Sequence, residues 1–197
     1  MVHLRPFRPL FVTGLFVGSI AAVCSVFAQP LIIYNATDSL PHGIYRVIKQ
    51  QNYKRGDLIV FPVPEQVRRL VIQRDWLKPD SYLIKTVAAI NGDNVWITCG
   101  QVFVNGKSFG AIKKKDRQGL PLPSLAFKDK LSAGKIAVFQ RSDDSFDSRY
   151  FGPIDERDII GKAVPILVFH TTDNGNQPSM ADMQERYVQN ESSGSAR

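Results

Sequence analysis

The longest apolar run of the chain lies near its start. Residues 10–28 contain no charged side chain, and a helix of that length would be about 28 Å long, close to the roughly 30 Å hydrocarbon core of a membrane. Arg5 and Arg8 precede the run, whereas the eleven residues after it carry only Asp38. The positive-inside rule therefore predicts a single-pass anchor with a cytoplasmic amino terminus, and it places the rest of the chain outside the cytoplasm.

A cleaved signal peptide is the alternative for this run. Val26-Phe27-Ala28 before Gln29 is a passable cleavage site. The run, however, has 19 residues, whereas the apolar region of a signal peptide usually has roughly 7 to 15. Its length thus favours a retained anchor over cleavage.

After residue 28 the apolar residues form short runs, several of them with a two-residue period. Such runs, rich in β-branched and aromatic residues and bounded by turn residues, predict strands. The predicted strands cover residues 31–34, 44–48, 57–63, 82–90, 95–99, 102–104, 135–140 and 159–169. Residues 95–99 and 102–104 predict a hairpin around Gly100. Pro165 inside the last run predicts that this strand lies at an edge or bulges.

Two segments between these runs differ. Val67, Leu70 and Val71 have helical spacing and predict a short helix over residues 65–77. Residues 109–132 carry lysines, glycines and prolines without a convincing period. We expect them to form a long excursion from the β core.

The chain therefore divides into four parts. We expect a cytoplasmic segment at residues 1–9, a transmembrane anchor at residues 10–28, an extracytoplasmic domain at residues 29–170 and a polar tail at residues 171–197. Seven or so short strands with one short helix predict a mainly β domain. The domain is long enough to bury one sizeable core.

Composition argues against several classes of function. The net charge of +7 is moderate, and the densest basic run, Lys113-Lys114-Lys115, has no interleaved aromatic residues. This run is typical of a solvated loop near an anionic membrane surface rather than of a nucleic-acid contact. The two cysteines and three histidines lack the spacing of a disulfide or a metal site. We expect no metal ion, no other cofactor and no nucleic acid.

One serine and one lysine stand out as candidate chemistry. Ser39 lies in a turn between two predicted strands, and Lys85 lies in residues 82–90, the most apolar stretch outside the anchor. A lysine can take the proton of a serine hydroxyl only when it is neutral, which requires its pKa to fall by roughly three units, about 4 kcal/mol. Burial can supply that shift. The alternative is a lysine on the solvent face of an amphipathic strand.

The motifs around these two residues resemble the S26 family of signal peptidases, and most closely its TraF branch of conjugative-transfer peptidases. After the apolar run come Ser-x-Pro-x-Gly at residues 39–43, Lys85 in an apolar strand ending in Gly92-Asp93, and Ser-x-Asp-Ser-Arg at residues 145–149. The match runs from about residue 10 to about residue 168. Any one motif is weak, but four in this order are quite specific.

The resemblance implies a role for six residues. Ser39 would be the nucleophile, Lys85 the general base, Thr37 a contributor to the oxyanion hole, Ser145 the residue that orients the lysine, and Asp147 and Arg149 an ion pair that shapes the site. Asp147 is also the acidic residue expected to be essential in the TraF branch. The alternative for Asp147 and Arg149 is a turn in which these side chains satisfy backbone groups.

The resemblance also implies where the protein works and on what. It implies a serine endopeptidase held in the bacterial inner membrane, with its catalytic domain on the periplasmic side. Its partners would be membrane lipids and a protein substrate, either a conjugative pilin precursor or another membrane-inserted precursor. Hydrolysis of the acyl-enzyme and ring closure by the pilin's own amino terminus both stay open.

Two departures from the general signal peptidases favour the specialised branch. The usual Gly-Asp-Asn is replaced by residues 139–144, Phe-Gln-Arg-Ser-Asp-Asp, and the nucleophile is followed by Leu-Pro-His-Gly rather than by a Met-Pro-Thr-like sequence. A general type I signal peptidase nevertheless stays an alternative.

Other candidates involve different chemistry or none. Gly106-Lys107-Ser108-Phe109-Gly110 fits the nucleophile-elbow pattern but lacks the strand, turn and helix that this motif needs. A Ser/His/Asp triad would have to use His42 or His170. A tethered β-domain that only assembles a secretion system and a soluble self-cleaving repressor-type protease are the remaining alternatives, and the apolar run argues against the second.

Overall fold

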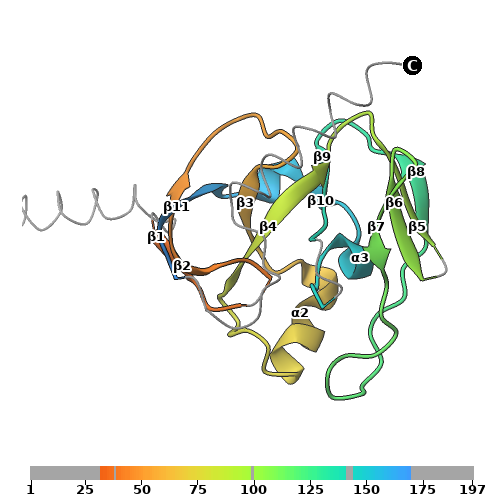
Figure 1. Cartoon of the computed structure of the whole chain (residues 1–197), viewed down its shortest axis with the longest axis horizontal. Coiled ribbons are helices and arrows are strands. Elements are labelled where there is room, and N and C mark those ends of the chain that lie inside the picture. The colour runs from red at the N-terminus through yellow and green to blue at the C-terminus, as the bar shows by residue number, and fades with distance from the viewer. Residues whose placement is uncertain (1–31, 38, 99, 141–143, 170–197) are drawn as a thin grey trace, which may run out of the picture. The chain divides into compact units, whose positions relative to one another are not determined.

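The computed structural model describes residues 32–37, 39–98, 100–140 and 144–169 (Figure 1). The predicted anchor, the polar tail, Cys99 and His170 lie outside these residues. Within the described ranges no helix is long and apolar enough to cross a membrane.

The described part of the chain is mainly β, as predicted. Its strands are β1 (Ile32–Asn35), β2 (His42–Ile48), β3 (Leu58–Pro62), β4 (Tyr82–Ala89), β5 (Asn94–Thr98), β6 (Gln101–Val104), β7 (Lys107–Ala111), β8 (Phe127–Lys130), β9 (Lys135–Val138), β10 (Ile154–Asp155) and β11 (Gly161–Phe169). Its helices are α2 (Glu65–Gln73), α3 (Ser148–Phe151) and the 3₁₀ turn η1 (Glu156–Asp158).

Seven strands form one sheet in the order β1-β2-β11-β3-β4-β9-β10 (Figure 1). All neighbouring strands in it are antiparallel. Strand β4, which carries Lys85, lies between β3 and β9 and is buried from Leu83 to Ala89. A lysine in such a strand has little access to solvent.

A second sheet has the order β7-β6-β5-β8 and corrects the prediction for residues 109–132 (Figure 1). The predicted hairpin is present as β5 and β6, but β7 and β8 extend it on either side. Only residues 112–126 lie between β7 and β8, and a bridge from Lys115 to Pro121 closes part of them. Strand β8 escaped prediction because Phe127-Lys128-Asp129-Lys130 is a short charged strand with no apolar alternation.

Three groups of buried side chains support these layers. One packs α2 and α3 against the large sheet through Val67, Val71, Ile59, Phe61, Val87, Val138 and Phe151. A second joins the small sheet to β4 and β9 through Val95, Ile97, Val102, Val104, Ala88, Ala89 and Phe139. A third lies under the Ser39 turn and contains Leu40, Tyr45, Val60, Ile84 and Ala163.

The predicted helix over residues 65–77 is real but ends earlier. Helix α2 stops at Gln73, and Asp75 has a left-handed backbone with φ of 52° that ends the helical path. Trp76 and Leu77 still pack against the core. These two apolar residues lie within the predicted range but outside the helix itself. Arg149, for which a turn was the alternative, lies in the four-residue helix α3, and Asp147 caps that helix.

The prediction for Pro165 is confirmed. Strand β11 pairs with β3 only through Gly161 and Lys162, so at Pro165 it has a partner on one side only. Its register with β2 shifts between Pro165 and Leu167, which is a bulge.

The close approach of β2 and β11 explains why residue 43 is a glycine. A Cβ placed on Gly43 would lie 2.2 Å from the carbonyl oxygen of Leu167 and 2.8 Å from Cα of Val168. Both contacts are with backbone, which cannot turn aside as a side chain could. Gly43 is therefore required for β2 and β11 to lie together.

We predict that Gly43→Ala destabilises the protein by about 2–3 kcal/mol, because β2 and β11 must move apart. Thermal unfolding of the full chain would measure this loss. Arg46→Ala, at an exposed position of the same strand, is the control and should change stability by less than about 0.5 kcal/mol. Equal melting temperatures for Gly43→Ala and wild type would contradict the packing argument.

Candidate active site

Ser39 lies in the turn between β1 and β2, as predicted, and the turn is anchored on both sides. Leu40, next to Ser39, is 2% exposed and packs in the core with Tyr45 and Val60. The hydroxyl of Tyr45 donates to the carbonyl of Pro41 at 2.7 Å. Ser39 itself is half-buried. The turn therefore presents a partly accessible hydroxyl on a fixed backbone.

Lys85 meets this hydroxyl from the central strand β4. Its side chain is buried, and Nζ lies 3.1 Å from Oγ of Ser39 and 3.0 Å from Oγ of Ser145. Ser39, Lys85 and Ser145 are thus brought together from three separate parts of the chain. The alternative of a lysine on a solvent face is wrong.

Burial lowers the pKa of Lys85 from 10.5 to about 8. The nearby carboxylate of Asp147 opposes this shift, and the guanidinium of Arg149 adds to it. At about 1.36 kcal/mol per pKa unit, the surroundings disfavour the charged form by about 3 kcal/mol. A neutral Lys85 can accept a proton from Ser39 through its lone pair while donating a hydrogen bond to Ser145.

Asp147 and Arg149 form an ion pair with no exposed side-chain surface. Nε of Arg149 lies 2.8 Å from Oδ1 of Asp147, and the same oxygen accepts from the backbone N–H of Arg149 at 3.2 Å. Arg149 also donates to the carbonyls of Ala111 and Gln140. Burial raises the pKa of the Asp147 carboxyl, and Arg149, Lys85 and the backbone donors pull it down. The pair is a closed, fully hydrogen-bonded unit.

Hydrogen bonds attach the ion pair and Ser148 to the end of β9, the strand next to that of Lys85. Oδ2 of Asp147 accepts from the N–H of Gln140 at 3.0 Å, and Oγ of Ser148 accepts from the N–H of Val138 at 2.9 Å. Val138 ends β9 and pairs with Val87 of β4. The segment that carries Ser145 is therefore held in register with the strand that carries Lys85. The ion pair that the resemblance implied is present, and both side chains also satisfy backbone groups, as the alternative held.

Thr37 also lies beside the nucleophile, and it has a second partner that sequence reasoning missed. Oγ1 of the exposed Thr37 lies 3.3 Å from Oγ of Ser39 and 2.7 Å from Oδ1 of Asn35. Asn35 is 5% exposed. The one available signal was an Asn two residues before a Thr at the end of a predicted strand, a spacing typical of an Asx turn.

Of the competing candidates, the nucleophile elbow at Ser108 is wrong, and His170 of the alternative triad lies outside the described residues. Ser108 lies within strand β7 and is exposed, so the strand, turn and helix of a nucleophile elbow are absent there. His42 is the first residue of β2. Across the described ranges, no group of three or more His, Cys, Asp or Glu side chains could hold a metal ion.

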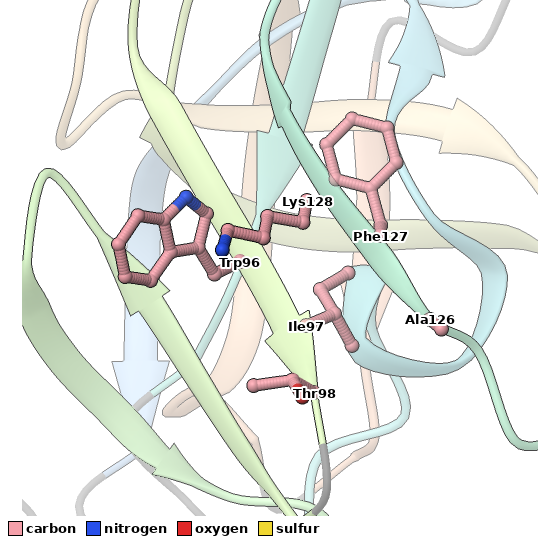
Figure 2. Close-up of a pocket in the computed structure, with 6 residues that line it drawn as sticks. All are labelled: Trp96, Ile97, Thr98, Ala126, Phe127 and Lys128. Carbon is pink, nitrogen blue, oxygen red and sulfur yellow. The ribbon is translucent and has the colours of Figure 1, made fainter.

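An open hollow of about 510 Å³ lies on the small sheet, and neither Ser39 nor Lys85 lines it (Figure 2). It is lined by Trp96, Ile97, Thr98, Ala126, Phe127 and Lys128. Its charged group, Nζ of Lys128, lies 4.7 Å from the centre of the Trp96 ring. The candidate site is instead at Ser39 and Lys85, where a buried amine lies within hydrogen-bond distance of a hydroxyl.

Comparison with known proteins shows the family of the chain. The sequence model described as "Signal peptidase, peptidase S26" matches residues 7–168. The plasmid transfer protein TraF of Escherichia coli is 34% identical over 148 residues, which are 68% of this chain and 82% of that protein. The conjugal transfer protein TraF of Agrobacterium tumefaciens strain 15955 is 31% identical over 179 residues, 82% of this chain and 96% of that protein.

A solved signal peptidase I from Enterococcus faecalis V583 aligns with 58% of this chain and 98% of its own, at 18% identity and a TM-score of 0.34. At these values the family assignment rests on sequence similarity.

We predict that Asp147→Asn destabilises the protein by about 3–5 kcal/mol, because it leaves the Arg149 guanidinium buried without a counter-charge. Chemical denaturation of the full chain would measure the change. The matched control is Asp144→Asn. Asp144 pairs with Lys113 and Arg117 at the surface, and its loss should cost under about 1 kcal/mol. Equal stabilities of the two variants would contradict the proposed importance of the buried pair.

Proposed function

Because the chain belongs to the signal peptidase S26 family, we propose that it is a serine endopeptidase with Ser39 as nucleophile and Lys85 as general base. The observation that carries the proposal is the 3.1 Å contact between Nζ of a buried Lys85 and Oγ of Ser39. A buried lysine without a full counter-charge costs folding free energy, so a functional role is a natural reason to keep it.

The proposed reaction begins with neutral Lys85. Its lone pair takes the proton of the Ser39 hydroxyl as Oγ attacks the carbonyl carbon of a peptide bond. Ser145, 3.0 Å from Nζ, accepts a hydrogen bond from the amine and directs the lone pair toward Ser39. When the tetrahedral intermediate collapses, the carbon–nitrogen bond breaks, and Lys85 passes its proton to the leaving amine. An acyl-enzyme on Ser39 remains.

The charge on the substrate oxygen needs hydrogen-bond donors during attack. We assign this role to the backbone N–H of Ser39 and to the hydroxyl of Thr37, which lies 3.3 Å from Oγ of Ser39. Thr37 has one hydroxyl proton, and in the resting structure that proton points to Asn35. The hydroxyl must therefore turn toward the substrate to contribute. One such donor is commonly worth about 3 kcal/mol.

Asp147 and Arg149 take a supporting role in this proposal. They hold the segment of Ser145 against β9, and their opposing charges adjust the pKa of Lys85 from nearby. The resemblance implied an ion pair that shapes the site, which agrees with this role, whereas the catalytic and essential role that it implied for Asp147 stays a prediction.

We extend the proposal to substrate and location. The relatives are named as transfer proteins of plasmids and conjugation, and on that basis the substrate is a conjugative pilin precursor. Residues 10–28 anchor the enzyme in the inner membrane, and residues 29–170 face the periplasm, where the anchor brings enzyme and precursor into one plane. Water or the pilin's own amino terminus would then attack the acyl carbon, giving a linear or a cyclic product.

Two other functions make different predictions. A general type I signal peptidase would process many exported proteins rather than one precursor. A non-catalytic assembly factor would need the fold but not the contact between Lys85 and Ser39. The buried Lys85, held against two serine hydroxyls, favours catalysis over a purely structural role.

We predict that Ser39→Ala and Lys85→Met each reduce precursor processing by at least about 10³-fold without loss of folded protein. The measurement is the intact mass of the pilin of the same transfer system after co-expression. Removal of a terminal segment would show cleavage, and a further loss of one water would show ring closure. The matched control is Ser108→Ala, at an exposed serine on β7. Full processing by Ser39→Ala would rule out the proposed nucleophile.

We predict a pH–rate profile with one acidic limb. Lys85 acts as a base only when neutral, so kcat/KM should fall about tenfold per pH unit below the pKa of about 8 and level off above it. Steady-state rates between pH 6 and pH 10 would measure the profile. A rate that stays flat through this range would show that Lys85 is not the base.

A further inference from the structure

Asn35, the last residue of β1, occupies the centre of the turn that carries Ser39. Its side chain is buried, with 5% of the residue exposed. Its backbone pairs with Gly43, the residue that packs against β11. The side chain therefore starts from a fixed point at the base of the turn.

The carboxamide oxygen of Asn35 accepts two hydrogen bonds from Thr37. One comes from the backbone N–H at 3.2 Å and the other from the hydroxyl at 2.7 Å. The carboxamide nitrogen donates to the carbonyls of Thr37, Leu40 and Pro41 at 3.0, 3.1 and 3.2 Å. These partners determine which end of the amide is oxygen, because a flipped amide would set N–H against N–H.

The hydrogen bonds of the Asn35 carboxamide go to residues on both sides of Ser39 in the sequence. Thr37 precedes the nucleophile by two residues, and Leu40 and Pro41 follow it. One rigid planar group thus ties the two halves of the turn together across Ser39. Tyr45 donates to the same Pro41 carbonyl from below.

The bond to Thr37 also decides how Thr37 meets Ser39. A threonine hydroxyl has one proton, and here Oδ1 of Asn35 accepts it. Toward Ser39, 3.3 Å away, Thr37 can then offer only a lone pair. Oγ of Ser39 accepts from Nζ of Lys85 at 3.1 Å and lies 3.3 Å from Oγ1 of Thr37, so it is held between the two groups.

We propose that Asn35 is a positioning residue of the nucleophile turn, which holds Ser39 at the distance from Lys85 that proton transfer needs. The proposal rests on the function proposed above for Ser39 and Lys85. Asn35 contacts neither the base nor the substrate carbonyl. Its effect is on the geometry of attack, where a displacement of about 1 Å can cost about 10²-fold in rate.

The test compares Asn35→Ala with wild type in the full chain, with the same pilin precursor as substrate. We expect kcat to fall about 10- to 100-fold, KM to stay within about threefold, and the acidic limb to keep its apparent pKa near 8. Rates are normalised to folded protein by thermal unfolding. Wild-type kcat per folded molecule, or a loss that lies mainly in KM, would overturn the proposal.

The matched control is Asn105→Ala. Asn105 lies in the turn between β6 and β7, where its side chain accepts from the N–H of Asn94 and donates to Asp93. This variant loses two side-chain bonds of a turn in the other sheet, and its kcat should equal that of wild type. A fall equal to that of Asn35→Ala would show a general effect of lost stability and would overturn the proposal.

Two further variants keep the outcome clear. If Asn35→Ala does not fold, Asn35→Ser takes its place, because its shorter polar side chain loses the bonds across the turn to the carbonyls of Leu40 and Pro41 while the Thr37 hydroxyl stays in place. A wild-type kcat there would overturn the proposal, and a fall at unchanged KM would support it. Ser39→Ala distinguishes failure of this inference from failure of the proposed function. If Ser39→Ala is inactive while Asn35→Ala is fully active, only the role of Asn35 is wrong. If Ser39→Ala is active, both the proposed function and this inference are wrong.

Discussion

The contact between the Lys85 amine and the Ser39 hydroxyl is the interaction on which the account of this protein depends. Burial of Lys85 in strand β4 disfavours the charged form of its amine. The same burial lowers the pKa of Lys85 to about 8, which makes the amine a usable base. A solvent-exposed lysine at the same distance from Ser39 would have fewer than about one neutral amine in a thousand at pH 7, against about one in ten for a pKa of about 8. The chemistry therefore follows from where the sheet places the strand.

Three separate attachments hold this contact in place. The Ser39 turn is held by buried Leu40 and by the carboxamide of Asn35. Strand β4 is held between β3 and β9 in the large sheet. The segment of Ser145 is held to β9 by the buried pair of Asp147 and Arg149. Each attachment comes from a different part of the chain, so the site exists only in the folded domain.

Much of this could be predicted from the sequence because its signals are local. The strand pattern of residues 82–90 placed Lys85 in an apolar strand, and Pro41 and Gly43 placed Ser39 in a turn. Strand β8 and helix α3 could not be predicted, because Phe127–Lys130 pairs through its backbone without an apolar face and Ser148–Phe151 is too short for a helical period. Asn35 was missed because its role consists of bonds to a turn whose shape a sequence does not display. The catalytic roles of the six candidate residues stay predictions.

The most direct test of the central claim is an NMR titration of the Lys85 side-chain amine in the resting, full-length protein, with Lys85→Met used to assign the signal. The account predicts a pKa near 8, well below the value of 10.5 for a lysine in water. A pKa at or above 10 would leave at most about one amine in a thousand neutral at pH 7, against about one in ten for a pKa of about 8, and would contradict the role of Lys85 as the base for Ser39.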